Sequence, residues 1–275
     1  MKIDNSLMSQ MVQRTGASQQ LLTKLYEKLG TGKRINRASD DAAGLAVAKE
    51  LEKMSRGYKQ AGANIGDAMS ALRIAEGSTQ NISDMLGRMH ELSVQAGNDT
   101  LNADNRKALN QEFQQLKQEI ERQAASTQFN TQDLLSGQSP LSDGTGKFQV
   151  GPGSEDQVDA QASDFTMAGL GVMDLDISTQ SGAMGALDGL KQAMDQVNES
   201  RTGFGSQINR FEFTASNNEN MNINTTAALS LIEDLDFAKG LMEKASADVL
   251  GQSAMLAQRN FQDISRTSML ALMGQ

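Results

Sequence analysis

The chain has 275 residues and a net charge of −9, and it contains no Cys, no Trp, two Pro and a single His. Without Cys it can form neither a disulfide framework nor a thiolate zinc site, and one His excludes a metal site that needs several imidazoles. No apolar run is long enough to span a membrane, and the first residues lack the apolar stretch of a secretory signal. We therefore expect no membrane segment and no cleaved signal peptide.

The two ends of the chain have similar patterns. Residues 4–29 and 236–273 each carry a thin, interrupted apolar stripe, which alone makes only a marginal helix. The stripes contain Leu7, Met11, Leu21, Leu25 and Leu29 at one end and Leu241, Met242, Ala245, Val249, Leu256, Ile264, Leu270 and Met273 at the other. We predict that the terminal helices pair with each other and with other copies of the chain. The predicted assembly residues are Leu21, Leu25, Leu29, Val249, Leu256 and Ile264; a bundle closed within one chain is the alternative.

A charged, glycine-rich stretch, LGTGKRINRASDDAAGLAVAKELE, follows the first predicted helix. Gly30 and Gly32 are expected to end that helix, because glycine enters the left-handed region at little cost. Ser39 or Asp40 is expected to cap the next helix, with Asp40 and Asp41 in its first turn, where the helix dipole favours negative charge. The stretch is therefore predicted to be a hinge between a terminal helix and a separate long helix.

Charge is distributed unevenly around this hinge. Residues 1–60 carry eleven Lys and Arg against six Asp and Glu, so the acidic excess lies in the rest of the chain. A basic arm can bind nucleic acid or an anionic membrane, and it can equally meet the acidic part of another copy. Its only aromatic residues, Tyr26 and Tyr58, are too few for a base-stacking platform. We expect no nucleic-acid partner and no membrane partner.

The strongest signal is a heptad pattern in two long segments. Spacings that alternate between four and three residues predict coiled-coil seams, which we define as the inward-facing rows of such helices. The first seam comprises Ala61, Ile65, Ala68, Leu72, Ala75, Thr79, Ile82, Leu86, Met89 and Ser93. The second comprises Leu187, Leu190, Met194, Val197, Arg201, Phe204, Ile208 and Phe211, and a shorter one comprises Leu109, Phe113, Leu116 and Ile120. Long helices from both halves of the chain are therefore predicted to pack together.

The middle of the chain, from Gly137 to Gly185, is rich in glycine and holds both prolines. The stretch GKFQVGPGSEDQVDAQ predicts a strand, a Gly-Pro-Gly turn and a second strand. The stretch MAGLGVMDLDIS alternates weakly and is a candidate third strand, and a plain linker is the alternative for the whole region. Only scattered Asp and Glu occur here, which disfavours an enzyme or a ligand-binding module.

Taken together, these motifs resemble bacterial flagellin, the filament subunit of the flagellum. The resemblance runs through GTGKRINRASDDAAGLAVA, MLGRMHELSVQAGNDT and STQFNTQDLLSG, and it resumes at VNESRTGFGSQINRFE, LIEDLDFAKG and VLGQSAMLAQRN. It covers nearly the whole chain in order. The hinge residues that carry the family signature are Gly32, Arg34, Asn36, Asp40 and Asp41. The last residues, SRTSMLALMGQ, depart from the Leu-rich ending of many members.

The resemblance implies a mainly α fold: a long coiled-coil helical hairpin, or rod, with a small β-hairpin and with paired N- and C-terminal helices. It implies an inner filament-core domain of residues 1–41 and 236–275, and a rod domain of residues 42–235 with a β element at about 138–180. It also implies a structural protein without enzymatic activity, cofactor or metal, which polymerises into the extracellular filament used for swimming. Hook–filament junction proteins have similar ends and are the alternative.

The resemblance further implies several partners besides other copies of the chain. These are the flagellar export apparatus with its chaperone, which secretes without a cleaved signal, and the filament cap and junction proteins. In members that the animal receptor Toll-like receptor 5 recognises, an Arg, a Leu and a Glu form the contact centre, and they align with Arg88, Leu92 and Glu112. His90 stands where many such members carry a second Arg, which weakens that expectation.

Overall fold

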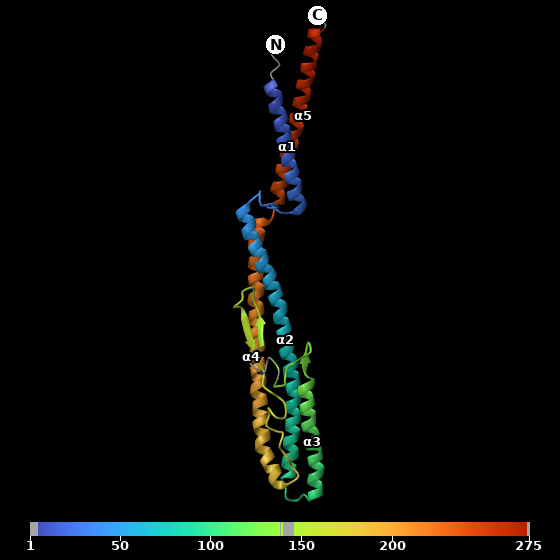
Figure 1. The fold of residues 1–275 in the computed structure, drawn as a ribbon, viewed down its shortest axis with the longest axis vertical. Coiled ribbons are helices and arrows are strands. Elements are labelled where there is room, and N and C mark those ends of the chain that lie inside the picture. Colours follow the sequence, from blue (N-terminus) through green and yellow to red (C-terminus); the bar gives the residue numbers. More distant parts are fainter. Residues whose placement is uncertain (1–4, 138, 140–145, 274–275) are drawn as a thin grey trace. The chain divides into compact units, whose positions relative to one another are not determined.

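The computed structural model describes residues 5–137, 139 and 146–273, and helices account for most of them (Figure 1). The helices are α1 (Asn5–Thr31), α2 (Ala42–Ala96), α3 (Ala103–Ser126), α4 (Gln180–Glu233) and α5 (Phe237–Met273). The strands are β1 (Gln128–Phe129), β2 (Gln132–Asp133), β3 (Gly146–Gln149) and β4 (Gln157–Ala160). The predicted mainly α fold is confirmed. Residues 138 and 140–145 of the predicted β element, and the side chains of Leu7, Met11 and Met273, lie outside the described part.

The chain divides into two compact units. Unit 1 consists of Met1–Lys53 and Asn224–Gln275, and unit 2 consists of Met54–Ile223. The division therefore falls within α2 and within α4. From the sequence we predicted the corresponding domain boundaries between the helices, after residue 41 and after residue 235.

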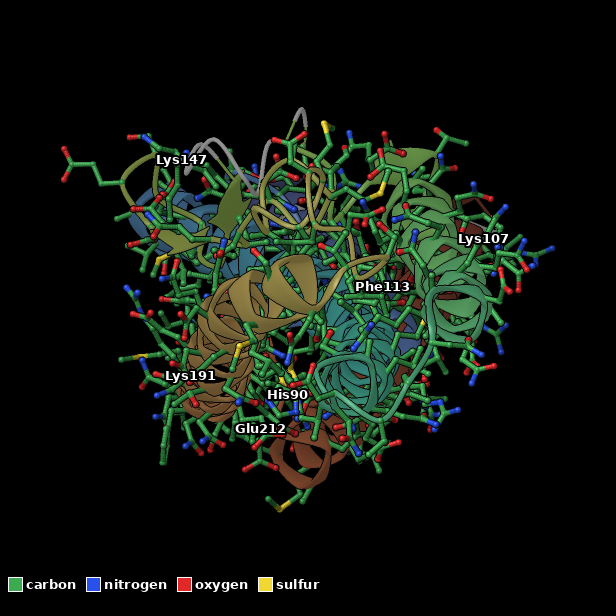
Figure 2. The ribbon with its side chains drawn as sticks, turned by 90° about the horizontal axis from the view of Figure 1, so that it is seen from below. His90, Lys107, Phe113, Lys147, Lys191 and Glu212 are labelled. Atoms are coloured by element: carbon green, nitrogen blue, oxygen red, sulfur yellow. The ribbon has the colours of Figure 1, made fainter. Side chains whose placement is uncertain are left out.

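The core of unit 2 follows the predicted seams. All ten positions of the α2 seam, from Ala61 to Ser93, are buried. The α4 seam alternates between fully buried positions, such as Phe204 and Phe211, and half-buried ones, such as Arg201. In α3, Phe113 is fully buried and points inward among the helices, whereas Lys107 lies at the periphery (Figure 2). Heptad spacing in long uninterrupted helices thus builds one apolar core.

The predicted β-hairpin is confirmed as the antiparallel pair β3–β4. It packs against the helices of unit 2 through both its strand and its turn. The ring of Phe148 meets the edge of the Phe211 ring at a centroid distance of 5.7 Å, and the Asn64 amide donates to the Gln149 carbonyl at 3.1 Å. The turn residue Pro152 lies directly on Gly57 of α2, where any side chain would collide with it.

Two features of the middle region differ from the sequence prediction. A second short hairpin, β1–β2, follows α3, and its turn places Asn130 and Thr131 in the left-handed region. The candidate third strand at residues 167–178 is wrong, because this segment forms turns and pairs with no strand among the described residues.

Polar side chains from α3 hold that segment instead. The ammonium of Lys117 donates to the carbonyls of Met173 and Leu175, and the amide of Asn110 donates to the carboxylate of Asp176 at 2.9 Å. Burial lowers the pKa of Lys117, while the nearby acidic groups, of which Asp176 is one, oppose that shift. These contacts satisfy backbone carbonyls that a β-ladder would otherwise have to satisfy.

Candidate functional site

Helices α1 and α5 lie side by side in unit 1 (Figure 1). The face of α5 that meets α1 carries small residues, which let the two helices approach closely. A Cβ added to Gly251 would lie 3.1 Å from the Ser18 hydroxyl oxygen, and one added to Gly240 would lie 3.3 Å from a Leu29 methyl. Between these two points the Ser18 hydroxyl donates to the Ala247 carbonyl at 3.3 Å.

The six predicted assembly residues divide into two groups. Leu25 is only 5% exposed and Leu29 is half-buried, so both take part in the α1–α5 contact within one chain. The remaining four are exposed in the single chain: Leu21, Val249, Leu256 and Ile264. The structure thus buries two of the predicted residues of α1 in the pair, but it leaves Leu21 and the three predicted residues of α5 exposed.

Helix α5 leaves many large apolar side chains exposed in the single chain. Its exposed apolar residues are Phe237, Leu241, Met242, Val249, Leu250, Met255, Leu256, Ile264 and Leu270. Because successive residues of a helix are about 100° apart, this set covers every side except the one that faces α1. Exposed charged side chains such as Glu243 and Arg259 lie between them, but this many large apolar side chains left exposed indicate a surface that a partner covers. The sequence pattern showed one stripe of this surface and missed Phe237, Leu250 and Met255, which lie off that stripe.

Two hollows lie along the α1–α5 pair. One has a volume of about 400 Å³ and is lined by residues that include Leu25 and Met242, and the other has about 480 Å³ and extends to Arg14. Leu21 and Leu250 line both hollows. The pair therefore presents apolar concave surface as well as exposed side chains, and both are suited to receive side chains of another molecule.

Of the two glycines that were predicted to end α1, Gly32 does so. The helix ends at Thr31, and Gly32 follows with φ of +71°, donating its N–H to the Lys28 carbonyl at 2.9 Å. This is the left-handed helix ending that glycine favours. Gly30 lies within the last turn of the helix.

The break after α1 is joined to the break between α4 and α5. The Arg34 N–H donates to the Glu233 carbonyl at 2.7 Å, and the Arg34 guanidinium donates to the Ile232 carbonyl at 2.7 Å. The Lys33 ammonium lies 2.7 Å from the Glu233 carboxylate, which is almost fully buried. The predicted hinge is therefore held by paired backbone and side chains from both ends of the chain.

Asp40 organises the turn before α2. Its carboxylate accepts the N–H groups of Asn36 at 3.1 Å and Arg37 at 3.0 Å. These two bonds favour the ionised form, so they hold the pKa of Asp40 below its ordinary value. The signature residues Asn36 and Asp40 thus act together in shaping one turn.

The residue that caps α2 is Asp41. The helix begins at Ala42, and the Asp41 carboxylate accepts the Gly44 N–H at 2.8 Å, the standard position for an N-cap. The predicted cap, Ser39 or Asp40, was wrong by one or two residues. The physical reason is that the Asp40 carboxylate is already used by the preceding turn.

The structure brings two of the three predicted receptor residues together. The Arg88 guanidinium donates to the Glu112 carboxylate at 2.9 and 3.0 Å, and both side chains are partly exposed. Leu92, however, is fully buried in the hydrophobic core. A direct surface role for Leu92 is therefore contradicted, because it lies inside unit 2.

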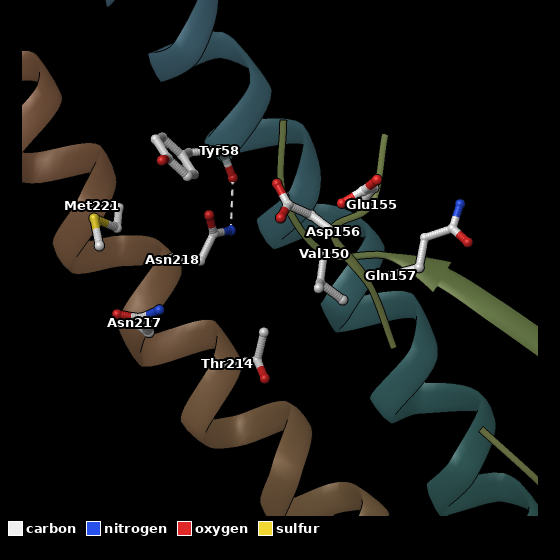
Figure 3. A pocket seen from close by; sticks show the side chains of 10 residues that line it. Tyr58, Val150, Glu155, Asp156, Gln157, Thr214, Asn217, Asn218 and Met221 are labelled. Carbon is white, nitrogen blue, oxygen red and sulfur yellow. Dashed lines mark hydrogen bonds between the residues drawn. The ribbon is translucent and has the colours of Figure 1, made fainter. Parts of the chain in front are cut away.

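The described residues offer little that could carry chemistry. They contain no group of three or more His, Asp or Glu side chains placed to hold a metal ion, and none of their helices is long and apolar enough to cross a membrane. A hollow of about 420 Å³ in unit 2 is lined by Tyr58, Glu155, Asp156 and Asn218, among others (Figure 3). Its polar groups serve the fold: Asn218 donates to the Tyr58 carbonyl, and Asp156 accepts the Gly153 N–H.

The chain is similar to known proteins over nearly its whole length. Residues 4–140 match the family described as the bacterial flagellin N-terminal helical region, and residues 187–270 match the bacterial flagellin C-terminal helical region. A flagellin from Halalkalibacterium halodurans is 40% identical over 243 residues, which cover 87% of this chain and 88% of that protein. A flagellar filament 33 kDa core protein from Treponema phagedenis is 34% identical, and the match covers 94% and 96% of the two chains.

A solved structure described as a flagellar hook-associated protein from Vibrio parahaemolyticus has a TM-score of 0.55 and 17% identity, and covers 70% of this chain and 99% of that one. At this identity the likeness shows a common fold and does not favour the junction-protein alternative. The two family regions and the relatives that match both ends of the chain establish its membership. The chain belongs to the bacterial flagellin family.

Proposed function

We propose that this chain is the structural subunit of an extracellular flagellar filament and that it polymerises through α1 and α5. The observation that carries the proposal is the set of large apolar side chains that α5 leaves exposed on the sides that do not contact α1. Exposed apolar surface of this extent marks an interaction site in a soluble protein. Relatives that match almost all of this chain are named flagellins and filament core proteins, which supports the same conclusion.

A truncation tests the proposal. Removal of residues 1–35 takes away α1 and the first residues of the hinge while sparing unit 2, whose core is formed by α2, α3, α4 and the β3–β4 hairpin. We expect the truncated chain to fold but to form no filaments when seeds and salt are added, as judged by electron microscopy. The intact chain should form long filaments of uniform diameter under the same conditions. Filaments from the truncated chain would refute the proposal, and only short assemblies from the intact chain would favour a junction protein.

Our expectation of partners other than further copies of the chain rests on the family resemblance. We expect export by the flagellar apparatus with a chaperone, and contacts with cap and junction proteins at the filament ends. For recognition by Toll-like receptor 5, the residues that we expect to contact the receptor are now Arg88 and Glu112 alone, because Leu92 is buried. A reporter-cell assay in which Arg88→Ala signals as strongly as the unaltered chain would remove that expectation.

A further inference from the structure

All the sulfur in this chain is thioether sulfur. The sequence has 16 Met and no Cys, so methionine is the side chain that a mild two-electron oxidant reaches first. The described methionines range from fully buried through half-buried to exposed. Met89 is fully buried in the core of unit 2, whereas Met242 and Met255 of α5 are 64% and 48% exposed.

The two exposed methionines of α5 belong to the apolar surface described above. Met242 lines the hollow of about 400 Å³ between α1 and α5, together with Leu21, Leu25 and Leu250. Met255 precedes Leu256 and is exposed on the same helix. Both side chains are therefore accessible to a small oxidant in the single chain, at the surface that other subunits are expected to cover.

We propose that Met242 and Met255 are modification sites at which peroxide oxidants switch off self-assembly of the free subunit. The inference rests on the proposed function. In the reaction, the thioether sulfur attacks one oxygen of hydrogen peroxide, an S–O bond forms and the O–O bond breaks. The sulfur loses two electrons and becomes a sulfoxide, and the peroxide is reduced to water.

The consequence for assembly follows from the surroundings of the two side chains. A sulfoxide is polar, and its oxygen needs hydrogen-bond donors that water supplies in the free subunit. Covering that oxygen with the apolar side chains of a neighbouring subunit removes the water without replacing its hydrogen bonds. Subunits already in a filament should resist the oxidant, because the same contact shields the sulfur.

Unit 2 supplies matched controls. Met173 and Met184 are 51% and 61% exposed, much like Met242 and Met255, but neither lies on α5. Their oxidation rates in the free subunit should be similar. A general toxic effect of the oxidant would act through all four positions, whereas the proposed effect depends on two.

The test is a partition experiment on the full chain. Free subunits are treated with hydrogen peroxide to an average of about one sulfoxide per chain, the peroxide is removed, and seeded filaments are sedimented. Peptide mass spectrometry then compares sulfoxide at each methionine between pellet and supernatant. We expect sulfoxide at Met242 and Met255 to be depleted about tenfold in the pellet, and sulfoxide at Met173 and Met184 to be evenly distributed. Even distribution at Met242 and Met255 would overturn the inference.

A pair of variants gives an independent answer. The Met242→Leu, Met255→Leu double variant keeps side-chain size and should assemble after peroxide treatment as well as before it. The Met173→Leu, Met184→Leu variant should remain as sensitive as the unaltered chain. Loss of assembly by the α5 variant after treatment would overturn the inference. Failure of the untreated, unaltered chain to sediment would overturn the proposed function itself, and with it this inference.

Discussion

Substitutions of Leu21 and Leu25, both on α1, should distinguish the contact within one chain from the contact between subunits. The two residues are one turn apart on α1, yet Leu25 is 5% exposed and Leu21 is 49% exposed. We predict that Leu25→Ala weakens the α1–α5 pair within one chain. Leu21→Ala should leave that pair largely intact and should instead weaken the contact between subunits.

The exposures set the expected magnitudes. Replacing a buried Leu by Ala costs about 2–5 kcal/mol, and nearly all of that cost should appear in the single chain for Leu25. Full burial of a Leu side chain is worth about 1.5–3 kcal/mol. Since about half of the Leu21 side chain is exposed, roughly 1 kcal/mol of its burial remains to be gained on assembly. A loss of that size raises the critical concentration for polymerisation about fivefold.

Two measurements distinguish the variants. Hydrogen exchange of the free subunit reports on the α1–α5 pair, and Leu25→Ala should lower the protection of α1 much more than Leu21→Ala does. Seeded sedimentation gives the critical concentration, which should rise for both variants. For Leu21→Ala the rise should come without a matching loss of protection in the free chain.

The reasoning fails if Leu21→Ala polymerises at the same critical concentration as the unaltered chain. That result would mean that the exposed half of Leu21 stays in water in the filament. The reasoning also fails if both variants lower the hydrogen-exchange protection of α1 equally in the free chain. The difference in burial between Leu21 and Leu25 would then not affect the stability of the α1–α5 pair.

Three further outcomes are expected. Gly57→Ala should destabilise unit 2 by about 1–3 kcal/mol in urea unfolding, because the new Cβ would lie 2.6 Å from Pro152. Gly66→Ala, with open space at that point, is the control and should be neutral or mildly stabilising. Lys117→Met should cost about 1–3 kcal/mol in the same assay, because two partly buried carbonyls lose their donor. The pKa of Asp40 is lowered, so its ionised carboxylate stabilises the turn fully at pH values above the ordinary Asp pKa, and this stabilisation is lost as the pH falls through the lowered pKa. Protection of the turn amides from hydrogen exchange should therefore fall only in acid below the ordinary Asp pKa. In Asp40→Ala the same amides should be poorly protected already at neutral pH.

The sequence predicted the seam of α2 at all ten positions, and the physical reason is its length. A heptad pattern that continues without a slip over so many turns is compatible with only one inward face. The same pattern could not show that Leu92 is also buried. Leu92 lies beside the seam and one turn after Arg88, which pairs with Glu112 of α3, so this side of α2 faces a second helix. Heptad spacing identifies one neighbour of a helix, whereas the number of neighbours is set by the tertiary fold.

The misplaced strand and the misplaced cap have a common origin. Weak alternation at residues 167–178 fits a strand and a loop equally well, and donors from α3 such as Lys117 decide the matter. Asp40 and Asp41 are equally good caps by composition, and the turn that engages Asp40 leaves the capping role to Asp41. In both cases local propensity was neutral, and contacts made elsewhere in the chain determined the structure.

The distribution of apolar residues between the two units explains how one chain can hold a folded core and still offer a surface for the proposed assembly. Unit 2 buries its seams within the chain, so it contributes a stable fold before any partner is present. Unit 1 uses small residues, Gly240, Ala247 and Gly251, for its internal contact and keeps most large apolar side chains of α5 outside it. Had these large side chains faced α1, the pair would be more stable alone, but less apolar surface would remain to drive assembly. The small residues that α5 places against α1 are therefore the feature that leaves its large apolar side chains available to other subunits.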